Sequence, residues 1–149
     1  MHFTSKEEYG LRAVIYLAER ESPRPIQVRE IAASEDIPEQ FLEQVLAALR
    51  RSGIIRSIRG AAGGYELAKA ARHIKAGDVI RALSGPIAPI PCMEEGSQVS
   101  CAHTDKCVVV SLWQRIQAAV SDIVDTTTIQ DMVDQKTQNE EGTFLAMNI

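Results

Sequence analysis

The sequence predicts a mainly α-helical protein with one small β-hairpin and a long C-terminal helix that needs a partner. Three observations lead to this fold class. Apolar residues recur at helical spacing in three segments before Gly53, two short β-rich runs then flank a cluster of glycines, and a long amphipathic pattern begins at Val108. At 149 residues the chain is long enough for one compact domain with an extension.

The first helix is predicted from Thr4 or Ser5 to about Arg20. Either residue can cap a helix whose first turn holds Glu7 and Glu8. The prolines of the segment 22–25 end this helix, and residues 28–33 have the pattern of a short second helix that stops near Ser34.

The third helix has the clearest pattern in the chain. It opens at Ile37-Pro38 and ends before Gly53, since proline suits a first helical turn and glycine terminates helices. Its apolar stripe consists of Phe41, Leu42, Val45, Leu46 and Leu49.

A hairpin follows, because the runs 54–58 and 65–67 surround the glycine-rich turn 60–64. Three helices and a hairpin, with a short second helix leading through a tight turn into a longer third, is the order of a winged helix-turn-helix. A fourth small helix is expected from Ala76 to Leu83, so residues 1–83 are predicted to form a DNA-binding domain.

The remainder divides into three parts. Residues 84–107 read as a cysteine-bearing loop with prolines at 86, 89 and 91. Residues 108–135 are predicted to form a dimerisation helix followed by a short helix that is capped by Thr128 and ends at Val133. Residues 136–149 are predicted to be a flexible tail. The stripe of the long helix comprises Val109, Leu112, Trp113, Ile116, Val120 and Ile123. The small domain cannot bury this stripe alone, so we expect a homodimer.

Composition points to a soluble cytoplasmic protein. The chain is 45% hydrophobic and 24% charged, and it has neither a membrane-spanning apolar run nor the pattern of a signal peptide. The net charge of −4 hides an asymmetry, because 13 basic and 11 acidic residues precede Gly85 whereas 3 and 9 follow. The segment 50–75 carries seven basic residues and only Glu66 against them, which is compatible with a nucleic-acid surface.

The polar side of the third helix has the chemistry for reading bases. Gln40, Glu43 and Gln44 lie off its apolar stripe, and glutamine pairs with adenine while glutamate accepts from the cytosine amino group. In the hairpin turn, Arg59 is expected to enter the minor groove or hold a phosphate, and Gly60 permits a close approach. The weaker candidates, expected to contact phosphates only, are Arg50, Arg51 and Arg56. The alternative for each of these residues is a solvated surface position without a DNA contact.

The three cysteines, Cys92, Cys101 and Cys107, are an odd number within one short loop, which argues against a disulfide framework. Iron in a cluster prefers thiolate ligands, and three thiols can hold three corners of an iron–sulfur cluster. Structural zinc held by the cysteines and His103 is an alternative, as are three incidental cysteines.

Several motifs together resemble the IscR/NsrR-type winged-helix transcription regulators of bacteria. They are Met1-x-Phe3-Thr4-Ser5-Lys6-x-x-Tyr9, Phe41-Leu42-Glu43-Gln44-Val45-Leu46-x-x-Leu49-Arg50, Arg59-Gly60-x-x-Gly63-Gly64-Tyr65 and Leu112-Trp113. The resemblance covers roughly residues 1–135. It implies a dimer in which the long helices cross, regulated binding to promoter DNA, and base contacts from the third helix.

The resemblance also bears on the cluster. The interval Cys101-x5-Cys107 matches cluster-binding members, while Cys92-x8-Cys101 is longer than their usual five. One branch of the family supplies a histidine where this chain has Val110, and another uses a carboxylate at the position of Glu8, reaching across the dimer. Glu8 is therefore the preferred fourth ligand, with His103 as a competitor; Glu8 is otherwise a helix-dipole residue or a capping-box partner of Ser5. A [2Fe-2S] and a [4Fe-4S] cluster both remain open.

The resulting hypothesis is a homodimeric transcription regulator whose binding to double-stranded promoter DNA is modulated by an iron–sulfur cluster. The alternative is a cluster-free regulator of the same fold that responds through thiol oxidation or a partner protein. We expect no catalysis, no small-molecule substrate and no membrane association, because the chain lacks a CxxC pair, a nucleotide-binding glycine fingerprint and a paired acid–base site.

Overall fold

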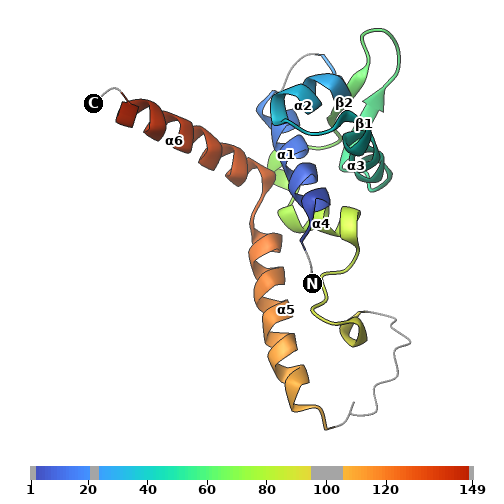
Figure 1. Ribbon diagram of the computed structural model, residues 1–149, viewed down its shortest axis with the longest axis vertical. Coiled ribbons are helices and arrows are strands. Elements are labelled where there is room, and N and C mark those ends of the chain that lie inside the picture. Colours follow the sequence, from blue (N-terminus) through green and yellow to red (C-terminus); the bar gives the residue numbers. More distant parts are fainter. Residues whose placement is uncertain (1–2, 21–23, 95–105, 148–149) are drawn as a thin grey trace.

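The computed structural model describes residues 3–20, 24–94 and 106–147, with side chains described to residue 143. Its elements are α1 (Ser5–Glu19), α2 (Val28–Glu35), α3 (Glu39–Arg51), β1 (Ile55–Ile58), β2 (Gly64–Leu67), α4 (Ala76–Ser84), α5 (Val108–Thr126) and α6 (Ile129–Met147). Two short 3-10 turns, η1 (Ala71–His73) and η2 (Pro91–Met93), lie between them. The mainly helical class with one antiparallel hairpin is as predicted (Figure 1).

Helix α1 begins with a capping box formed by Thr4 and Glu7. The Thr4 backbone N–H donates to Glu7 Oε2 at 2.6 Å, and the Thr4 hydroxyl accepts from the Lys6 N–H at 3.3 Å. The suggestion that Glu8 completes a box with Ser5 is therefore wrong, because Thr4 is the cap and the residue three positions later is Glu7.

The helix-turn-helix is made of α2 and α3. Helix α2 continues slightly beyond its predicted end and stops at Asp36, whose φ of 52° places it in the left-handed region. Pro38 occupies the N-cap position of α3, just before the first helical turn. The turn between the helices is short, so α2 and α3 pack directly against each other.

The hairpin pairs Ile55 with Leu67 and Arg56 with Glu66. Tyr65 also exchanges backbone hydrogen bonds with Ile26 at 2.9 and 2.8 Å, which ties the segment before α2 to the edge of β2. Gly64 is required there, since its φ is +154° and a Cβ would run into the Ile26 backbone. The hairpin is thus anchored to the helical body on one side while its turn extends outward.

The core lies between α1, α3 and α4, with side chains from the hairpin closing one end. Fully buried members include Val14, Ile31, Leu42, Val45, Leu46, Leu49, Ile55, Ile74, Val79 and Ile129. The apolar stripe predicted for the third helix faces this core, which leaves the opposite side of α3 in solvent. The burial of these side chains fixes the orientation of α3 relative to the hairpin.

Helix α5 is attached to the body through α4. The Arg81 guanidinium donates to both carboxylate oxygens of Asp125, at 2.6 and 2.8 Å. Gly77 lies directly beneath this ion pair, where a Cβ would collide with the Asp125 carboxylate. The Ala76 N–H also donates to the Thr127 carbonyl at 2.9 Å, so the joint between α5 and α6 is held against the start of α4.

Helix α6 is longer than predicted. Thr128 caps it, since the Thr128 hydroxyl accepts from the Asp131 N–H at 3.1 Å. The expected end at Val133 and the flexible tail from 136 are wrong, because the helix runs to Met147. Its first half is fastened to the body by buried Ile129 and by the ion pair of Lys136 with Glu19 at 2.8 Å.

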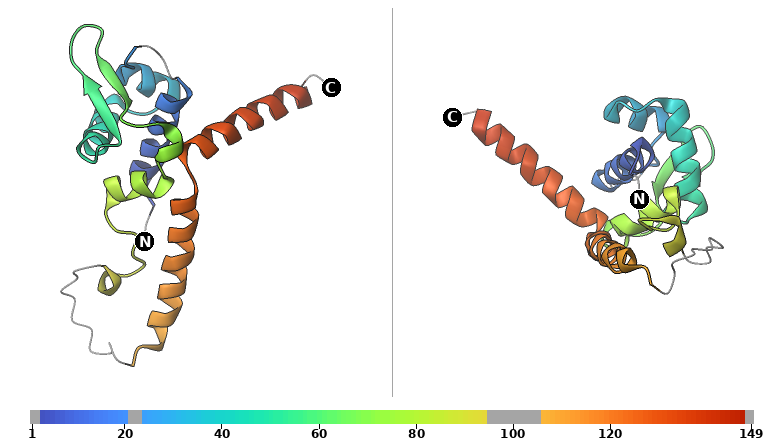
Figure 2. Two further views of the ribbon diagram at one scale, coloured as in Figure 1. Left: turned by 180° about the vertical axis from the view of Figure 1, so that it is seen from behind. Right: turned by 60° about the horizontal axis from the view of Figure 1, so that its bottom comes forward.

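The two C-terminal helices leave the compact body in different directions. Helix α5 runs along one side and past it, while α6 projects away from the body toward the C-terminus (Figures 1 and 2). No residue of α5 is buried in the part of the chain that the structure describes, and Val108, Val109, Leu112 and Ile123 are exposed. Among the described residues, no helix is long and apolar enough to cross a membrane.

Candidate nucleic-acid interface and cysteine loop

The solvent face of α3 carries the predicted base-reading residues together. Gln40, Glu43 and Gln44 are all exposed and recur at intervals of three and four residues, which places them on one face of the helix. The buried stripe on the opposite face holds the helix in place. The side chains thus have the donors and acceptors that a major-groove reader needs, on a rigid support.

Arg50 and Arg51 extend this face at the C-terminal end of α3, and both are exposed. Arg50 Nη1 donates to the Ser57 hydroxyl at 3.4 Å, so this side chain lies beside strand β1. Arg50 therefore places positive charge between the helix and the hairpin, and Arg51 adds a second exposed charge at the same end of α3. A phosphate backbone passing from one element to the other would meet this charge.

The hairpin turn presents Arg59 and Gly60. The Arg59 side chain is exposed and has no ion pair or hydrogen bond among the described residues. Gly60 has a φ of 112° and open space at the Cβ position, so the backbone conformation, rather than crowding, favours glycine there. The geometry leaves the Arg59 guanidinium available to a nucleic acid.

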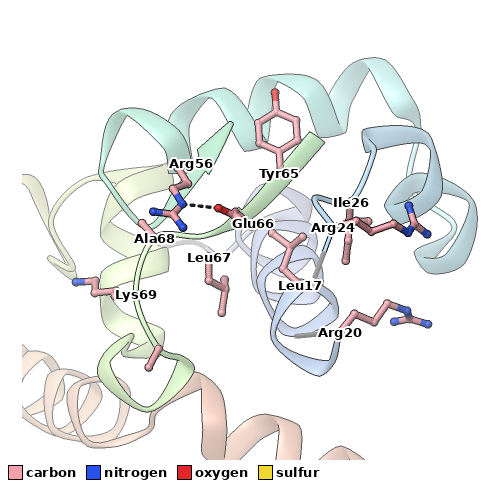
Figure 3. A pocket seen from close by; sticks show the side chains of 11 residues that line it. Leu17, Arg20, Arg24, Ile26, Arg56, Tyr65, Glu66, Leu67, Ala68 and Lys69 are labelled. Carbon is pink, nitrogen blue, oxygen red and sulfur yellow. Dashed lines mark hydrogen bonds and ion pairs between the residues drawn. The ribbon is translucent and has the colours of Figure 1, made fainter. Parts of the chain in front are cut away.

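Arg56 differs from Arg59 although both belong to the hairpin. Arg56 Nε donates to Glu66 Oε1 at 2.5 Å across the two strands. In Figure 3 these two side chains point toward each other, while Lys69 and Arg20 extend away at opposite ends of the same pocket. Arg56 is therefore already partnered within the chain, which makes it the weakest of the basic candidates.

Two of the three cysteines, Cys92 and Cys107, lie within the described residues between α4 and α5. Cys92 is exposed in the turn η2, and Cys107 is half-buried at the N-cap of α5. Cys101 and His103 lie outside the described residues, and no group of three metal-binding side chains occurs within them. The Gln117 amide donates to the Ile87 carbonyl at 2.9 Å, so the start of the loop is tied to the middle of α5.

Glu8 lies far from Cys107 in the same chain. It is exposed, lies 3.6 Å from Arg12 Nη1, and lines a groove of about 890 Å³ together with the C-terminal half of α5. The other lining residues are Phe3, Thr4, Ser5, Glu7, Leu11, Ile80, Val120, Ile123 and Val124. Val120 is about 20 Å along the helix from Cys107 at 1.5 Å per residue. A cluster on Cys107 is therefore out of reach of Glu8 of the same protomer.

Glu7 is the one buried charged residue among those described, with 2% of its surface exposed. Burial raises the pKa of its carboxyl group, but hydrogen bonds from the backbone and hydroxyl of Thr4 outweigh it and leave the pKa below its ordinary value. Oε2 receives both bonds from Thr4, whereas Oε1 has no partner within the described parts of the chain. The groove thus has an ionised carboxylate among mainly apolar side chains.

The sequence reasoning missed this groove and the joint beside it. Phe3, Leu11 and Ile80 come from three separate segments, and the Arg81–Asp125 pair joins residues 44 positions apart. No local spacing connects such residues. The exposed apolar stripe of α5 was the only available signal, and it indicated an interface without indicating which surface α1 contributes.

Comparison with known proteins agrees with this architecture. A family model described as Rrf2, iron-dependent transcriptional regulator, matches residues 3–135. The HTH-type transcriptional regulator CymR of Bacillus subtilis is 36% identical over 95% of this chain and 96% of its own length. Its structure, described as that of the global cysteine regulator, has a TM-score of 0.75 over 91% of this chain and 98% of the other.

Two further solved structures are similar. The IscR of T. potens has a TM-score of 0.74 at 32% identity and covers 91% of this chain and 88% of its own. The oxidized form of Staphylococcus aureus CymR has a TM-score of 0.71 at 34% identity. The match covers 89% of this chain and 96% of the CymR chain. The family model covers most of the chain, and the similar proteins are named as transcriptional regulators and share its fold. The chain therefore belongs to the Rrf2 family of transcriptional regulators.

Proposed function

We propose that this Rrf2-family regulator acts as a homodimer whose binding to promoter DNA is modulated by an iron–sulfur cluster. The observation that carries the proposal is the placement of Cys92 in the turn η2 and of Cys107 at the N-cap of α5, a helix with no buried residue among those described. The third thiol, Cys101, lies between them in the sequence. Thiolates are the ligands that iron–sulfur clusters use most.

DNA binding is assigned to the exposed face of α3 and the hairpin turn. Gln40, Glu43 and Gln44 would read base edges in the major groove, and Arg59 with Gly60 would meet the minor groove or a phosphate. Arg50 and Arg51 would contact phosphates between them. A dimer would present two such surfaces to a two-fold-related site.

The homodimer is supported by the apolar stripe of α5. Val109 and Ile123 lie at equal distances on either side of Ile116, as do Leu112 and Val120. Two copies of α5 that cross in opposite directions at Ile116 therefore bring each apolar side chain against one of the other copy. This pairing covers exposed Val109, Leu112 and Ile123 together.

The same antiparallel pairing supports Glu8 as the fourth ligand. It places the N-terminal end of one α5, with Cys107, beside the C-terminal end of the other, which forms the groove that Glu8 lines. Three thiolates from one chain and Glu8 from the second would hold the cluster. When bound, the cluster supplies a redox-sensitive group whose non-thiolate corner is open to exchange.

Anaerobic reconstitution tests the proposal. The absorption spectrum, iron and sulfide content are measured for the wild type, Glu8→Ala and His103→Ala, and the affinity for promoter DNA is measured for holo and apo protein at one salt concentration. We expect Glu8→Ala alone to alter the spectrum, and holo and apo affinities to differ. Wild type without iron and sulfide contradicts the cluster, and an unchanged Glu8→Ala spectrum contradicts the ligand.

The alternative is a cluster-free regulator that responds through thiol oxidation. It is favoured by the 34% identity to a S. aureus CymR solved in an oxidized form, and by the exposure of Cys92. Mild oxidation followed by mass spectrometry distinguishes the two hypotheses. A change of DNA affinity on oxidation of protein free of iron, reversed by reductant, supports the alternative.

A further inference from the structure

A pocket of about 560 Å³ lies at the base of the hairpin. It is formed by the end of α1, the segment that leads into α2, and β2 with the residues that follow it (Figure 3). Among the described residues that line it, none belongs to α3 and none is a cysteine. Its apolar lining consists of Leu17, Ile26, Leu67, Ala68 and Ala70. Small-molecule sites have volumes of about 300–1,000 Å³ and combine such a lining with a few polar groups, so the pocket has the size and composition of a ligand site.

The edge of β2 is open toward this pocket. The N–H and C=O groups of Tyr65 face away from β1, because both are bonded to Ile26. Successive residues of an antiparallel strand turn these groups to opposite edges, so those of Leu67 face the same way as those of Tyr65. The Ala68 N–H, which is bonded to the Ile54 carbonyl at 3.0 Å, confirms the alternation. Within the described parts of the chain Leu67 has no backbone partner on this edge, which leaves its N–H open to a ligand.

Two of the four cations that line the pocket are loosely held. Lys69 is exposed and has no ion pair or hydrogen bond with another described residue. Arg20 Nη1 lies 3.9 Å from Glu19 Oε2, but the same oxygen is only 2.8 Å from Lys136 Nζ. The Arg20 guanidinium lies over the Tyr16 ring, 3.7 Å from its centre. This contact engages the face of the guanidinium and leaves the N–H groups at its edge for a carboxylate.

The available charge lies at two ends of the pocket. Arg24 and Arg56 are each paired with a glutamate of the chain, at 3.3 and 2.5 Å. Figure 3 shows Lys69 at one end of the pocket and Arg20 at the other, with Leu67 between them. A ligand that matches this pattern has a negative group at each end and an aliphatic middle.

We propose that this pocket binds a linear dicarboxylate, with one carboxylate at Lys69 and the other at Arg20. Its methylene chain covers Leu67, whose N–H is a neutral donor to a carboxylate oxygen. A phosphate backbone matches the pocket less well, because it has no aliphatic part for the apolar lining. The proposal does not depend on the iron–sulfur cluster. The bound acid contacts β2, the strand that follows the turn with Arg59, so the ligand lies next to a DNA-binding element.

The test is a titration of the full chain, free of iron, with heptanedioate and with heptanoate at constant ionic strength. The backbone amide signals of the isotope-labelled protein are followed by nuclear magnetic resonance. We expect both acids to move the signals of Leu67 and Lys69. Heptanedioate should bind at least about tenfold more tightly than heptanoate, because its second carboxylate gains a charge-assisted hydrogen bond.

Lys69→Gln removes one of the two loosely held cations, and its exposed position leaves the core intact. It should weaken heptanedioate binding about tenfold and reduce the preference over heptanoate to less than about threefold, since heptanoate can use the Arg20 end. Lys75→Gln is the matched control, because Lys75 is an exposed lysine of the same domain that does not line the pocket. It should leave the preference unchanged.

Several results would overturn the proposal. They are equal affinities for the two acids in the wild type, no movement of the signals at millimolar concentrations, and equal losses in Lys69→Gln and Lys75→Gln, which reflect net charge alone. Movement concentrated on Phe3 and Ile123 also overturns it, because these residues line the groove beside α5. If a random-sequence duplex moves the Leu67 and Lys69 signals and the acids do not, the pocket belongs to the DNA-binding surface instead.

Discussion

The contrast between Arg59 and Arg56 gives a direct test of the DNA-binding surface. Both side chains belong to the hairpin and both are exposed, but Arg56 is paired with Glu66 at 2.5 Å and Arg59 has no partner among the described residues. We predict that Arg59→Ala weakens DNA binding because it removes a phosphate or minor-groove interaction, while Arg56→Ala has little effect.

The expected magnitude follows from how many phosphates each substitution leaves unneutralised. Each phosphate that a basic side chain neutralises contributes about 0.9 to the slope of log affinity against log salt concentration. A dimer carries two copies of Arg59, so the slope should fall by about 1.8 in Arg59→Ala. Because Arg56 is already partnered by a carboxylate, Arg56→Ala should change the slope by less than about 0.5.

The assay is binding to a random-sequence duplex over a series of salt concentrations, followed by fluorescence anisotropy. Random DNA isolates the phosphate contribution from base reading. Far-ultraviolet circular dichroism of both variants confirms that the hairpin and helices remain folded. Equal slopes for the two variants would refute the reasoning, because the ion pair with Glu66 is the structural difference on which it depends.

Three further predictions concern stability. Asp125→Asn should lower the free energy of unfolding by about 0.5 kcal/mol at neutral pH, since its half-exposed ion pair is partly screened by solvent. The hydrogen bonds from Arg81 lower the pKa of Asp125, so this stabilisation is present above the ordinary value of 3.8 and is lost as pH falls through the lowered pKa. The free energies of unfolding of wild type and Asp125→Asn, measured in urea, should therefore converge in acid. A difference that stays constant with pH would contradict the ion pair as its source. Leu46→Ala should cost about 2–5 kcal/mol by thermal or urea unfolding, because Leu46 is fully buried between α3 and the rest of the core; a cost below about 1 kcal/mol would be inconsistent with that packing. Gly64→Ala should lower the free energy of unfolding by about 1–3 kcal/mol, because alanine is strained at the φ of +154° that Gly64 adopts. Gly142→Ala in α6 is the control: there is open space at its Cβ position, so the free energy of unfolding should be unchanged or higher.

Local patterns were sufficient to predict most of the fold. The stripe of α3 from Phe41 to Leu49 and the β-rich runs around Gly60–Gly64 are periodicities that depend on neighbouring residues, and the structure has the corresponding helix and hairpin. Because these patterns are local, they did not predict the full length of α6. Its residues beyond Gln135 have no apolar periodicity, so they were expected to be a tail, although the backbone is helical to Met147.

The site residues divide in the same way. By itself the sequence determined which side chains have the chemistry: Gln40 and Gln44 to read bases, Arg59 to meet the backbone, and three cysteines to bind iron. Only the tertiary structure decided that Arg56 is paired with Glu66 and that Glu8 lies beside the C-terminal half of α5, away from Cys107 at its N-terminus. The physical reason is that ion pairs and grooves join segments distant in sequence. Which residues meet depends on how the whole core packs, and the periodicity of residues within one helix or strand does not contain that information.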